Sequence, residues 1–326
     1  MIKLDAYDRK IIEILLNNSR EQLSTISKGV RLKRENVDYK IRRLVASKLI
    51  KEFNTEFNEE KLNIKHYTVF VQLINLKETK EKEIINFLKS HPYISWIGIL
   101  AGKWSLTFDI FITKNNNLGT ILKEITSSFG DYIDEYVVLN LEDSGYYSYK
   151  YLNLKPKEFN LKPKEEKTKL DEIDYKILSL LNKNSRTTYV EISKATKLTP
   201  NGIKKRVTNL EKNQIINSYN ITLDFKELGY DWYGIQLKLA KFNEISEKKL
   251  KSFFKNHKKI LFYYKYIGAW DYDLGVIVKD SNELRVFING LRTNFPEEIK
   301  INDVFLTLEE ATGYKLPKGV FENQKT

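Results

Sequence analysis

Residues 194–211 read KATKLTPNGIKKRVTNLE, and this stretch decides the fold of the chain. Thr199 followed by Pro200 predicts the start of a helix, because a hydroxyl side chain caps free backbone N–H groups and proline is tolerated at the first helical position. A shorter helical segment precedes it, so the stretch indicates a helix-turn-helix whose second helix could enter the major groove of DNA. A plain amphipathic helix with a solvated lysine face is the alternative. The apolar face recurs at helical spacing at Ile203, Val207 and Leu210.

The same pattern occurs a second time in the chain, at a constant offset of 166 residues. Asn184-Ser185-Arg186 repeats Asn18-Ser19-Arg20, and Trp270 repeats Trp104. No net insertion or deletion is needed from residue 4 to about residue 140, so the repeated module has roughly the size of a domain. The sequence therefore predicts a tandem duplication and not a short solenoid repeat.

The composition favours a soluble protein with a polyanionic partner. The 326 residues carry a formal net charge of +12 with a pI near 9.3, and 41% of them are hydrophobic. The absence of cysteine excludes disulfides, thiol catalysis and cysteine-ligated zinc. Neither an N-terminal signal pattern nor an apolar run of the ~20 residues that span a membrane occurs, so we expect a cytoplasmic protein without membrane contact.

Each copy is predicted to fold as a winged helix-turn-helix domain followed by a ferredoxin-like domain. Three amphipathic helices and an extended segment fill the first part of each copy. The pattern then changes to β-α-β-β-α-β, so the fold class is α+β. The expected domains are a first helix-turn-helix at 1–60, a first ferredoxin-like domain at 61–145, a linker at 146–169, a second helix-turn-helix at 170–226, and a second ferredoxin-like domain with a tail at 227–326.

The outward faces of the two recognition helices differ in sequence. Lys33 stands where Thr199 caps the second copy, so the start of the first recognition helix is less well specified. The windows 28–43 and 194–206 each carry a net charge of +5. Asn and Arg side chains can pair with base edges, whereas Lys contacts phosphates more often. The candidate DNA-binding residues are Arg34, Asn36, Tyr39, Lys40 and Arg43 in the first copy and Thr199, Asn201, Lys204, Lys205, Arg206 and Asn209 in the second.

With these motifs, each copy resembles one subunit of the Lrp/AsnC family, the leucine-responsive or feast/famine regulators. The resemblance rests on Leu170-Asp171, on Asn184-Ser185-Arg186 and on the turn Gly268-Ala269-Trp270-Asp271. It covers nearly the whole chain outside the linker and the tail. It implies a sequence-specific transcription regulator whose ferredoxin-like domains pair into dimers and often larger rings. In many members of the family an amino acid binds at that interface.

A chain that contains two such subunits is expected to pair its two ferredoxin-like domains internally, because the linker raises their effective concentration. Pairing between chains, as a homo-oligomer, is the competing arrangement. The two recognition helices are unlike, so the expected target is double-stranded DNA with two unlike half-sites, about 34–36 Å apart or a multiple of that. An architectural DNA-binding protein of low specificity is the alternative.

The turn between the second and third strands of each ferredoxin-like domain is the candidate effector site. Asp271 could hold the ammonium group of an amino acid, but the first copy has Ser105 in its place. The alternative is that the glycines only allow tight turns and that the Trp rings pack. The candidate effector-binding residues are Gly102 and Trp104 in the first copy and Gly268, Trp270 and Asp271 in the second.

The sequence contains no recognisable catalytic motif. The three histidines, His66, His91 and His257, belong to no motif for metal or nucleophilic chemistry. We therefore expect no catalytic residues, no metal ligands and no cofactor, in a protein that is not an enzyme. An alternative comes from the resemblance, because the sirohaem decarboxylases are a related branch of this architecture that works as paired units.

Overall fold

The computed structural model describes residues 2–147, 150–152, 154, 169–241, 243–313 and 315–322. The chain divides into two compact units, which we call the head unit and the barrel unit. The head unit comprises Met1–Ile64, Leu154–Leu228 and Lys315–Thr326, and the barrel unit comprises Lys65–Asn153 and Gly229–Tyr314. Each unit therefore combines segments from both halves of the chain. Most of the expected linker at 146–169 lies outside the described residues.

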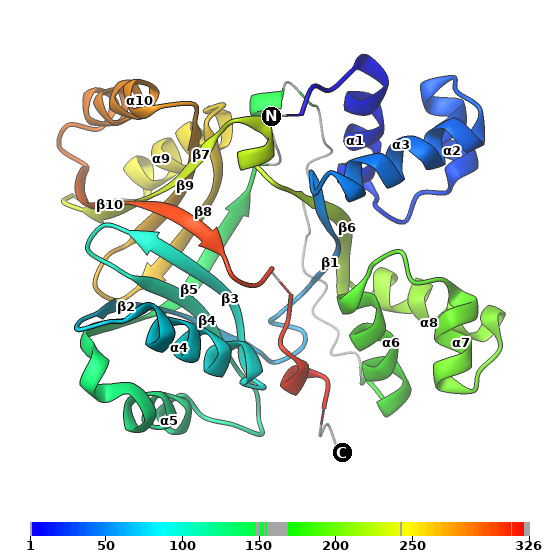
Figure 1. Ribbon diagram of the computed structural model, residues 1–326, viewed down its shortest axis with the longest axis horizontal. Coiled ribbons are helices and arrows are strands. Elements are labelled where there is room, and N and C mark those ends of the chain that lie inside the picture. Colours follow the sequence, from blue (N-terminus) through cyan, green and yellow to red (C-terminus); the bar gives the residue numbers. More distant parts are fainter. Residues whose placement is uncertain are drawn as a thin grey trace. The chain divides into compact units, whose positions relative to one another are not determined.

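The head unit contains both helix-turn-helix segments (Figure 1), each built from three helices and a following strand. In each, the apolar residues at helical spacing meet in one small core, as the sequence pattern predicts. The first head comprises α1 (Ala6–Asn17), α2 (Leu23–Val30), α3 (Arg34–Ala46) and β1 (Ile50–Phe57), and the second comprises α6 (Glu172–Lys183), α7 (Tyr189–Thr196), α8 (Pro200–Lys212), β6 (Ile216–Leu223) and the short η3 (Lys226–Leu228).

The helix starts follow the capping residues in the sequence. Asp5 caps α1 and Asp171 caps α6, and in both cases the side chain three residues later bonds back to the cap. Thr199 accepts a hydrogen bond from the backbone N–H of Gly202 at the start of α8, 3.1 Å away. Lys33, at the equivalent position before α3, makes no side-chain cap bond. The prediction of a less well specified start for the first recognition helix is confirmed.

The strands that follow the two heads pair with each other. β1 and β6 run antiparallel in a two-stranded sheet, with Phe53 opposite Ile221 and Thr55 opposite Tyr219. These backbone hydrogen bonds join the first half of the chain to the second half within the head unit. The segment expected to be a wing is therefore the strand that connects the two heads.

The order β-α-β-β-α-β occurs two times in the barrel unit, as the sequence pattern predicts. The first half comprises β2 (Lys65–Leu73), α4 (Glu78–Ser90), β3 (Ile94–Ala101), β4 (Leu106–Ile112), α5 (Leu118–Phe129), the short η1 (Gly130–Tyr132) and β5 (Ile133–Tyr146). The second comprises β7 (Asp231–Leu239), α9 (Glu244–Asn256), β8 (Ile260–Ile267), β9 (Tyr272–Val278), α10 (Ser281–Asn294) and β10 (Ile299–Glu310).

The eight strands of the two halves form one closed barrel with the order β10-β3-β4-β2-β5-β8-β9-β7. Two antiparallel junctions connect the halves: β5 pairs with β8, and β10 pairs with β3. Helices α4 and α5 lie on one side of the barrel and α9 and α10 on the other (Figure 1). Closing the sheet in this way leaves no unpaired edge strand between the halves.

Three hydrophobic clusters hold the barrel unit together. Two lie between each half's strands and its own helices. The third lies inside the barrel and takes residues from both halves, among them Phe70, Trp104, Trp270 and Phe305. Along each strand, the side chains alternate between the helix-covered outside and the interior of the barrel, because successive side chains point to opposite faces of a sheet. Among the described residues, no helix combines the length and the apolarity needed to cross a membrane.

Candidate functional site

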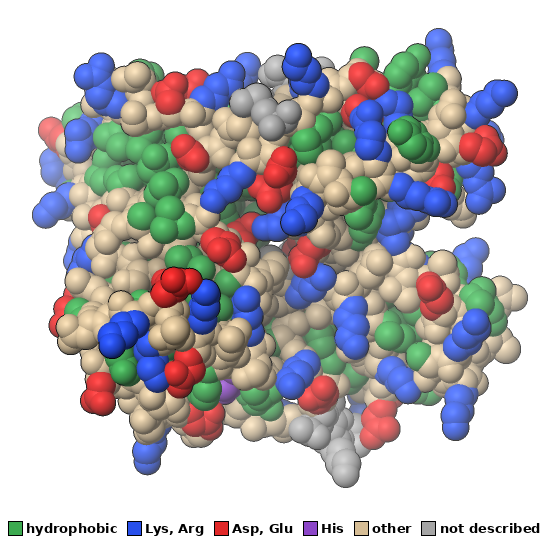
Figure 2. Space-filling view, in the orientation of Figure 1, with side chains coloured by type: hydrophobic (Ala, Val, Ile, Leu, Met, Phe, Trp, Pro, Cys, Tyr) green, Lys and Arg blue, Asp and Glu red, His purple; other side chains and the backbone are tan. Residues whose placement is uncertain are grey.

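The recognition helices α3 and α8 expose most of the side chains that were expected to contact DNA. Lys and Arg side chains are exposed over both heads in Figure 2, interspersed with acidic ones. Tyr39 is 66% exposed, which is unusual for a large aromatic side chain and places its ring where a partner can reach it. The other exposed candidates are Arg34, Asn36 and Arg43 in the first head and Thr199, Asn201, Lys204, Lys205 and Asn209 in the second.

Lys40 and Arg206, which occupy equivalent positions in α3 and α8, do not belong to this exposed set. The Lys40 Nζ lies 2.6 Å from Asp5 Oδ2 and 3.1 Å from Asp8 Oδ1. An Arg206 Nη lies 2.8 Å from the carboxylate of Asp174 and bonds Asp171 as well. Hydrogen bonding to Asp174 raises the pKa of Arg206. Each of these two residues ties its recognition helix to the capping carboxylates of the first helix, and contact of either with DNA stays a prediction.

The Arg43 side chain both bonds Asp8 and stays exposed at the surface of α3. Its Nη2 lies 2.5 Å from Asp8 Oδ2, yet 42% of the side chain remains exposed. Asp8 is fully buried and also accepts from Lys40, so this carboxylate organises the polar side of the first head. In the second head Asn209 stands at the position of Arg43, and it is exposed. The two reading faces therefore differ at this position in charge as well as in shape.

The repeated Asn-Ser-Arg motif joins the two heads. The Ser19 and Ser185 hydroxyl oxygens lie 2.6 Å apart, and both serines are fully buried. Arg20 donates to the carbonyl oxygens of Ser185 and Thr187, the second at 2.9 Å. Arg186 makes the reciprocal bonds, of which the one to the Ser19 carbonyl is 2.5 Å long. The repeat of the motif in the sequence marked these residues, but it did not show that the two copies lie in contact.

The glycine turns expected to hold an effector have a structural role in this fold. Ser105 Oγ accepts from the backbone N–H of Leu73 at 3.0 Å, and the Asp271 carboxylate accepts from that of Leu239 at 2.7 Å. Asp271 and Ser105 thus perform the same task at equivalent positions. A role of Asp271 in holding an ammonium group stays a prediction, and the hydrogen bond to Leu239 gives the carboxylate a structural role in the turn.

The other candidate effector residues are packed. Trp104 and Trp270 are each 2% exposed, and their rings lie 6.0 Å apart beside Phe70. Gly102 has a backbone φ of +144° and lies against Phe305, so its lack of a side chain allows a close approach. At Gly268 a side chain would collide with Leu139. These residues hold the turns and the barrel interior together, and none of them lines the pocket described next.

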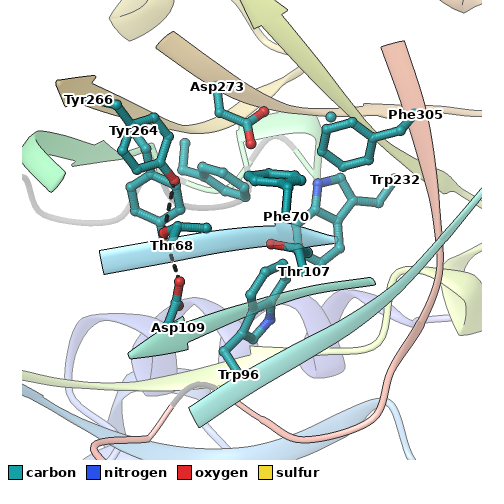
Figure 3. A pocket seen from close by; sticks show the side chains of 12 residues that line it. Thr68, Phe70, Trp96, Thr107, Asp109, Trp232, Tyr264, Tyr266, Asp273 and Phe305 are labelled. Carbon is teal, nitrogen blue, oxygen red and sulfur yellow. Dashed lines mark hydrogen bonds between the residues drawn. The ribbon is translucent and has the colours of Figure 1, made fainter. Parts of the chain in front are cut away.

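A pocket opens inside the barrel, with residues from both halves in its wall (Figure 3). It spans about 310 Å³ when open solvent is counted, but its enclosed volume is about 10 Å³, close to the room that one water molecule needs. Most of its wall is aromatic, and the polar side chains that reach it are threonines, tyrosines and two aspartates. Figure 3 shows Asp109 and Asp273 approaching the pocket from different strands. The aromatic wall consists of Phe70, Trp96, Trp232, Phe262, Tyr264, Tyr266 and Phe305.

The two aspartates differ in their surroundings. Asp109 Oδ1 accepts a 2.8 Å hydrogen bond from Thr68, which in turn accepts from Tyr266, and it lies 3.2 Å from His66 Nε2. Asp273 Oδ1 is buried, and no described residue forms a hydrogen bond with it. Burial, together with the charges of Asp303 and Asp109, raises the pKa of Asp273 to about 7. A buried carboxyl group whose pKa is shifted toward 7 is often found at functional sites.

Comparison with known proteins supports the assignment of the heads. A family described as winged helix-turn-helix DNA-binding matches residues 170–217. An uncharacterized HTH-type transcriptional regulator of Pyrococcus horikoshii is 30% identical over 121 residues, which cover 36% of this chain and 80% of that protein. The regulatory protein AsnC of Haemophilus influenzae is 40% identical over 87 residues, which cover 26% of this chain and 58% of that protein. This chain belongs to the Lrp/AsnC family of helix-turn-helix transcriptional regulators. The resemblance inferred from the sequence is confirmed.

The comparison with solved structures adds an enzyme to the neighbours of this Lrp/AsnC chain. The crystal structure of the siroheme decarboxylase NirDL matches with a TM-score of 0.65 at 12% identity, covering 95% of this chain and 94% of NirDL. At that identity the likeness concerns the fold alone. The expectation that the chain is not an enzyme was therefore wrong as an exclusion, because almost its whole length has the fold of an enzyme.

Proposed function

We propose that this chain is a sequence-specific DNA-binding transcription regulator that carries both of its reading heads in one polypeptide. The observation that carries the proposal is the pairing of β1 with β6, which brings the two recognition helices into one compact unit. A homodimer achieves this with two identical subunits, whereas here the two heads come from the two halves of one chain. The family membership supports the DNA-binding role.

The target that fits these heads is a bipartite site with unlike halves. The first head exposes Arg34, Asn36 and Tyr39, and the second exposes Asn201 and Lys204 at its reading face. Arg can pair with guanine and Asn with adenine in the major groove, whereas Lys adds phosphate contacts without sequence information. The half-sites are expected about one helical turn apart, ~34–36 Å, or at a multiple of that spacing.

Selection of bound sequences from random double-stranded DNA at physiological salt tests this proposal. We expect one enriched site with two different halves. Asn36→Ala should relax the sequence at one half and Asn201→Ala at the other, while Lys89→Ala, an exposed change in the barrel unit, should leave the site unchanged. A strictly palindromic optimum would contradict the proposal, and binding without enrichment would favour the architectural alternative.

Control by a small molecule is the second part of the proposed function. The pocket inside the barrel is the better candidate for an effector than the glycine turns, because side chains of both halves meet in its wall and its polar atoms are not all satisfied within the fold. A ligand bound there contacts strands of both halves at once. Binding free energy could in this way influence the pairing of the halves.

Catalysis by the barrel unit is a second candidate function. The relay from Tyr266 through Thr68 to Asp109 favours it, because hydroxyl and carboxyl groups in a shielded pocket are suited to moving protons. Incubation of the full chain with sirohaem, followed by absorption spectra and assay of released carbon dioxide, tests this candidate. Spectral change without carbon dioxide would indicate binding alone, and no change in either would remove sirohaem decarboxylation from consideration.

A further inference from the structure

The turn inside each helix-turn-helix has a left-handed backbone conformation at one residue. Arg31, which follows α2, has φ of +56° and ψ of +41°, and Lys197, which follows α7, has φ of +60° and ψ of +22°. Residues with a side chain rarely adopt this conformation, because Cβ comes too close to the following carbonyl oxygen. Glycine adopts it without that cost. Both copies therefore have a long basic side chain where glycine would suit the backbone better.

Two other pairs of equivalent positions have left-handed backbone in both copies. Asn63 and Gly229 have φ of +54° and +77°, and both residue types tolerate this conformation. Lys48 and Gln214, which follow the recognition helices, have φ of +61° and +57°, but only one of them is charged. Among the described residues, the pair in the helix-turn-helix turn is thus the only left-handed pair that is basic in both copies.

The fold gives no reason for these two side chains. Arg31 and Lys197 are both exposed. Within the part of the chain that the structure describes, neither side chain makes a hydrogen bond, an ion pair or a ring contact. The backbone N–H of Arg31 bonds the Ser27 carbonyl, which a glycine at this position would do as well. Residues held in costly backbone conformations are concentrated at functional sites.

Both turns come directly before a recognition helix. α3 begins three residues after Arg31, and α8 begins three residues after Lys197. When such a motif binds DNA, the first helix crosses the backbone and the second enters the major groove, so the turn between them lies close to the phosphates. The unpaired N–H groups at the start of the recognition helix add partial positive charge there.

The charge around each turn is also uniformly basic along the sequence. Residues 28–34 and 194–205 contain no acidic residue. Lys28 and Lys194, three residues before the two turn residues, are exposed and occupy equivalent positions. Each turn therefore presents two basic side chains, and an anion is the partner that this charge favours.

The turns are alike in the two heads, whereas the reading faces are not. Asp38 in α3 corresponds to Lys204 in α8, and Arg43 corresponds to Asn209. Two half-sites of DNA differ in their bases but have the same phosphates. Phosphate contacts position a protein on the duplex without reading its sequence. A feature that is common to two unlike heads is therefore suited to phosphate and not to bases.

We propose that Arg31 and Lys197 bind phosphate groups of double-stranded DNA beside each half-site and so fix how each recognition helix enters the groove. The inference rests on the DNA-binding role proposed above, to which it adds a contact outside the recognition helices. Phosphate contact is independent of base sequence, so the inference holds for a DNA-binding protein of low specificity as well.

Arg31→Gly and Lys197→Gly, made singly and together, should change stability and DNA binding in opposite directions. Glycine relieves the left-handed backbone, so the melting temperature, followed by circular dichroism, should rise or stay the same. Fluorescence anisotropy with a labelled duplex of random sequence measures the affinity over a series of salt concentrations. Each variant should bind at least about fivefold more weakly. The slope of log affinity against log salt should fall by about 0.9 for each lost contact.

Lys48→Gly is the matched control. Lys48 is exposed and basic and has the same backbone conformation, but it follows the other end of α3. The 13 residues of this helix place its two ends about 20 Å apart. We expect the control to change the affinity by no more than about twofold, because charges beyond the Debye length are largely screened.

Two further double variants separate charge from backbone strain. Arg31→Gln with Lys197→Gln removes both charges and keeps the left-handed conformation, which the chain already has at Gln214. This variant should bind DNA as weakly as the double glycine variant. Arg31→Lys with Lys197→Arg keeps both charges and should bind as the native chain does.

The outcomes distinguish the inference from the DNA-binding role. Native-like affinity and salt slope in the double glycine variant, or a loss no larger than that of Lys48→Gly, would overturn the inference and leave DNA binding intact. A lower melting temperature in both the glycine and the glutamine variants would show that the side chains support the fold, and would overturn it too. If the native chain binds no duplex, the DNA-binding role and the inference fail together.

Discussion

The hydroxyl groups of Ser19 and Ser185 meet at 2.6 Å in the centre of the head unit, although 166 residues separate them in the chain. Both serines are fully buried. Their backbone N–H groups bond across the unit as well, Ser19 to the carbonyl of Tyr219 and Ser185 to that of Phe53. Because the contacts are reciprocal, an approximate twofold axis passes between the two hydroxyls. The relative position of the two heads is set at this point.

A disulfide between positions 19 and 185 should form readily and stabilise the head unit. The native chain has no cysteine, so Ser19→Cys with Ser185→Cys introduces a single possible pair. We expect oxidation to raise the free energy of unfolding of the head unit by about 2–4 kcal/mol, because the cross-link restricts the unfolded chain. Non-reducing electrophoresis and denaturation with and without reductant measure this. The single variant Ser19→Cys is the control, and a double variant that stays reduced under oxidant would contradict the geometry.

Removing the arginines of the same contact should loosen the heads. Arg20→Ala leaves the Ser185 and Thr187 carbonyls without their donor, and it removes the guanidinium that lies 5.1 Å from the centre of the Tyr189 ring. Loss of a charged donor to buried carbonyls costs about 1–3 kcal/mol. The variant should then bind DNA with altered spacing between the half-sites almost as tightly as the native spacing. Its affinity for a series of DNA duplexes with different spacers measures this. Arg285→Ala, an exposed change in the barrel unit, should alter neither quantity.

The capping difference between the recognition helices should be measurable as stability. Thr199→Ala removes the hydroxyl that accepts from the Gly202 N–H and should destabilise the head unit by about 1 kcal/mol. Lys33→Ala removes no cap bond and should change little, whereas Lys33→Thr should add stability. Urea denaturation followed by far-ultraviolet circular dichroism compares the three variants. An equal loss for Thr199→Ala and Lys33→Ala would show that the cap bond contributes nothing.

Asp273 should make the barrel unit less stable as pH rises. Its folded-state pKa of about 7 exceeds its ordinary value of 3.8, so the folded state holds the proton more tightly than the unfolded state. Stability therefore falls between about pH 4 and pH 7, by about 4 kcal/mol in total at 1.36 kcal/mol per pKa unit. The groups that surround the carboxyl and act on this titration include Asp303 on β10, Asp109 on β4 and Tyr266 on β8.

Asp273→Asn should remove this dependence. We expect the variant to be more stable than the native chain at pH 8 and close to it at pH 4, because the amide never ionises. Tryptophan fluorescence during thermal unfolding reports on the barrel unit, which contains all four tryptophans. Asp134→Asn on β5 is the control for loss of an exposed carboxylate. The stability difference between the native chain and Asp273→Asn should therefore change from pH 5 to pH 8. If this difference is the same at both pH values, the pKa of Asp273 is not raised.

Local sequence signals identified the elements and their order. The Thr199-Pro200 pair placed the start of α8, the change of period after residue 66 placed the β-α-β-β-α-β order, and the offset of 166 residues revealed the second copy. The same signals could not show what each side chain touches. Lys40 and Arg206 were predicted to contact DNA, and the structure shows that both also bond the capping carboxylates of a neighbouring helix. Asp271 read as an effector ligand, yet it closes a turn.

The sequence by itself determined the α+β class, the repeat of its motifs at an offset of 166 residues and the two unlike helices at residues 34–46 and 200–212. Periodicity, capping and composition act over a few neighbouring residues, so they can be recognised without the fold. Only the tertiary structure decided how the copies combine. It grouped the heads through Ser19 and Ser185, closed the two sheets into one barrel, and brought Asp109 and Asp273 into one aromatic pocket. These relationships join residues more than 160 positions apart, and they depend on which strand edges and apolar faces find each other when the chain folds.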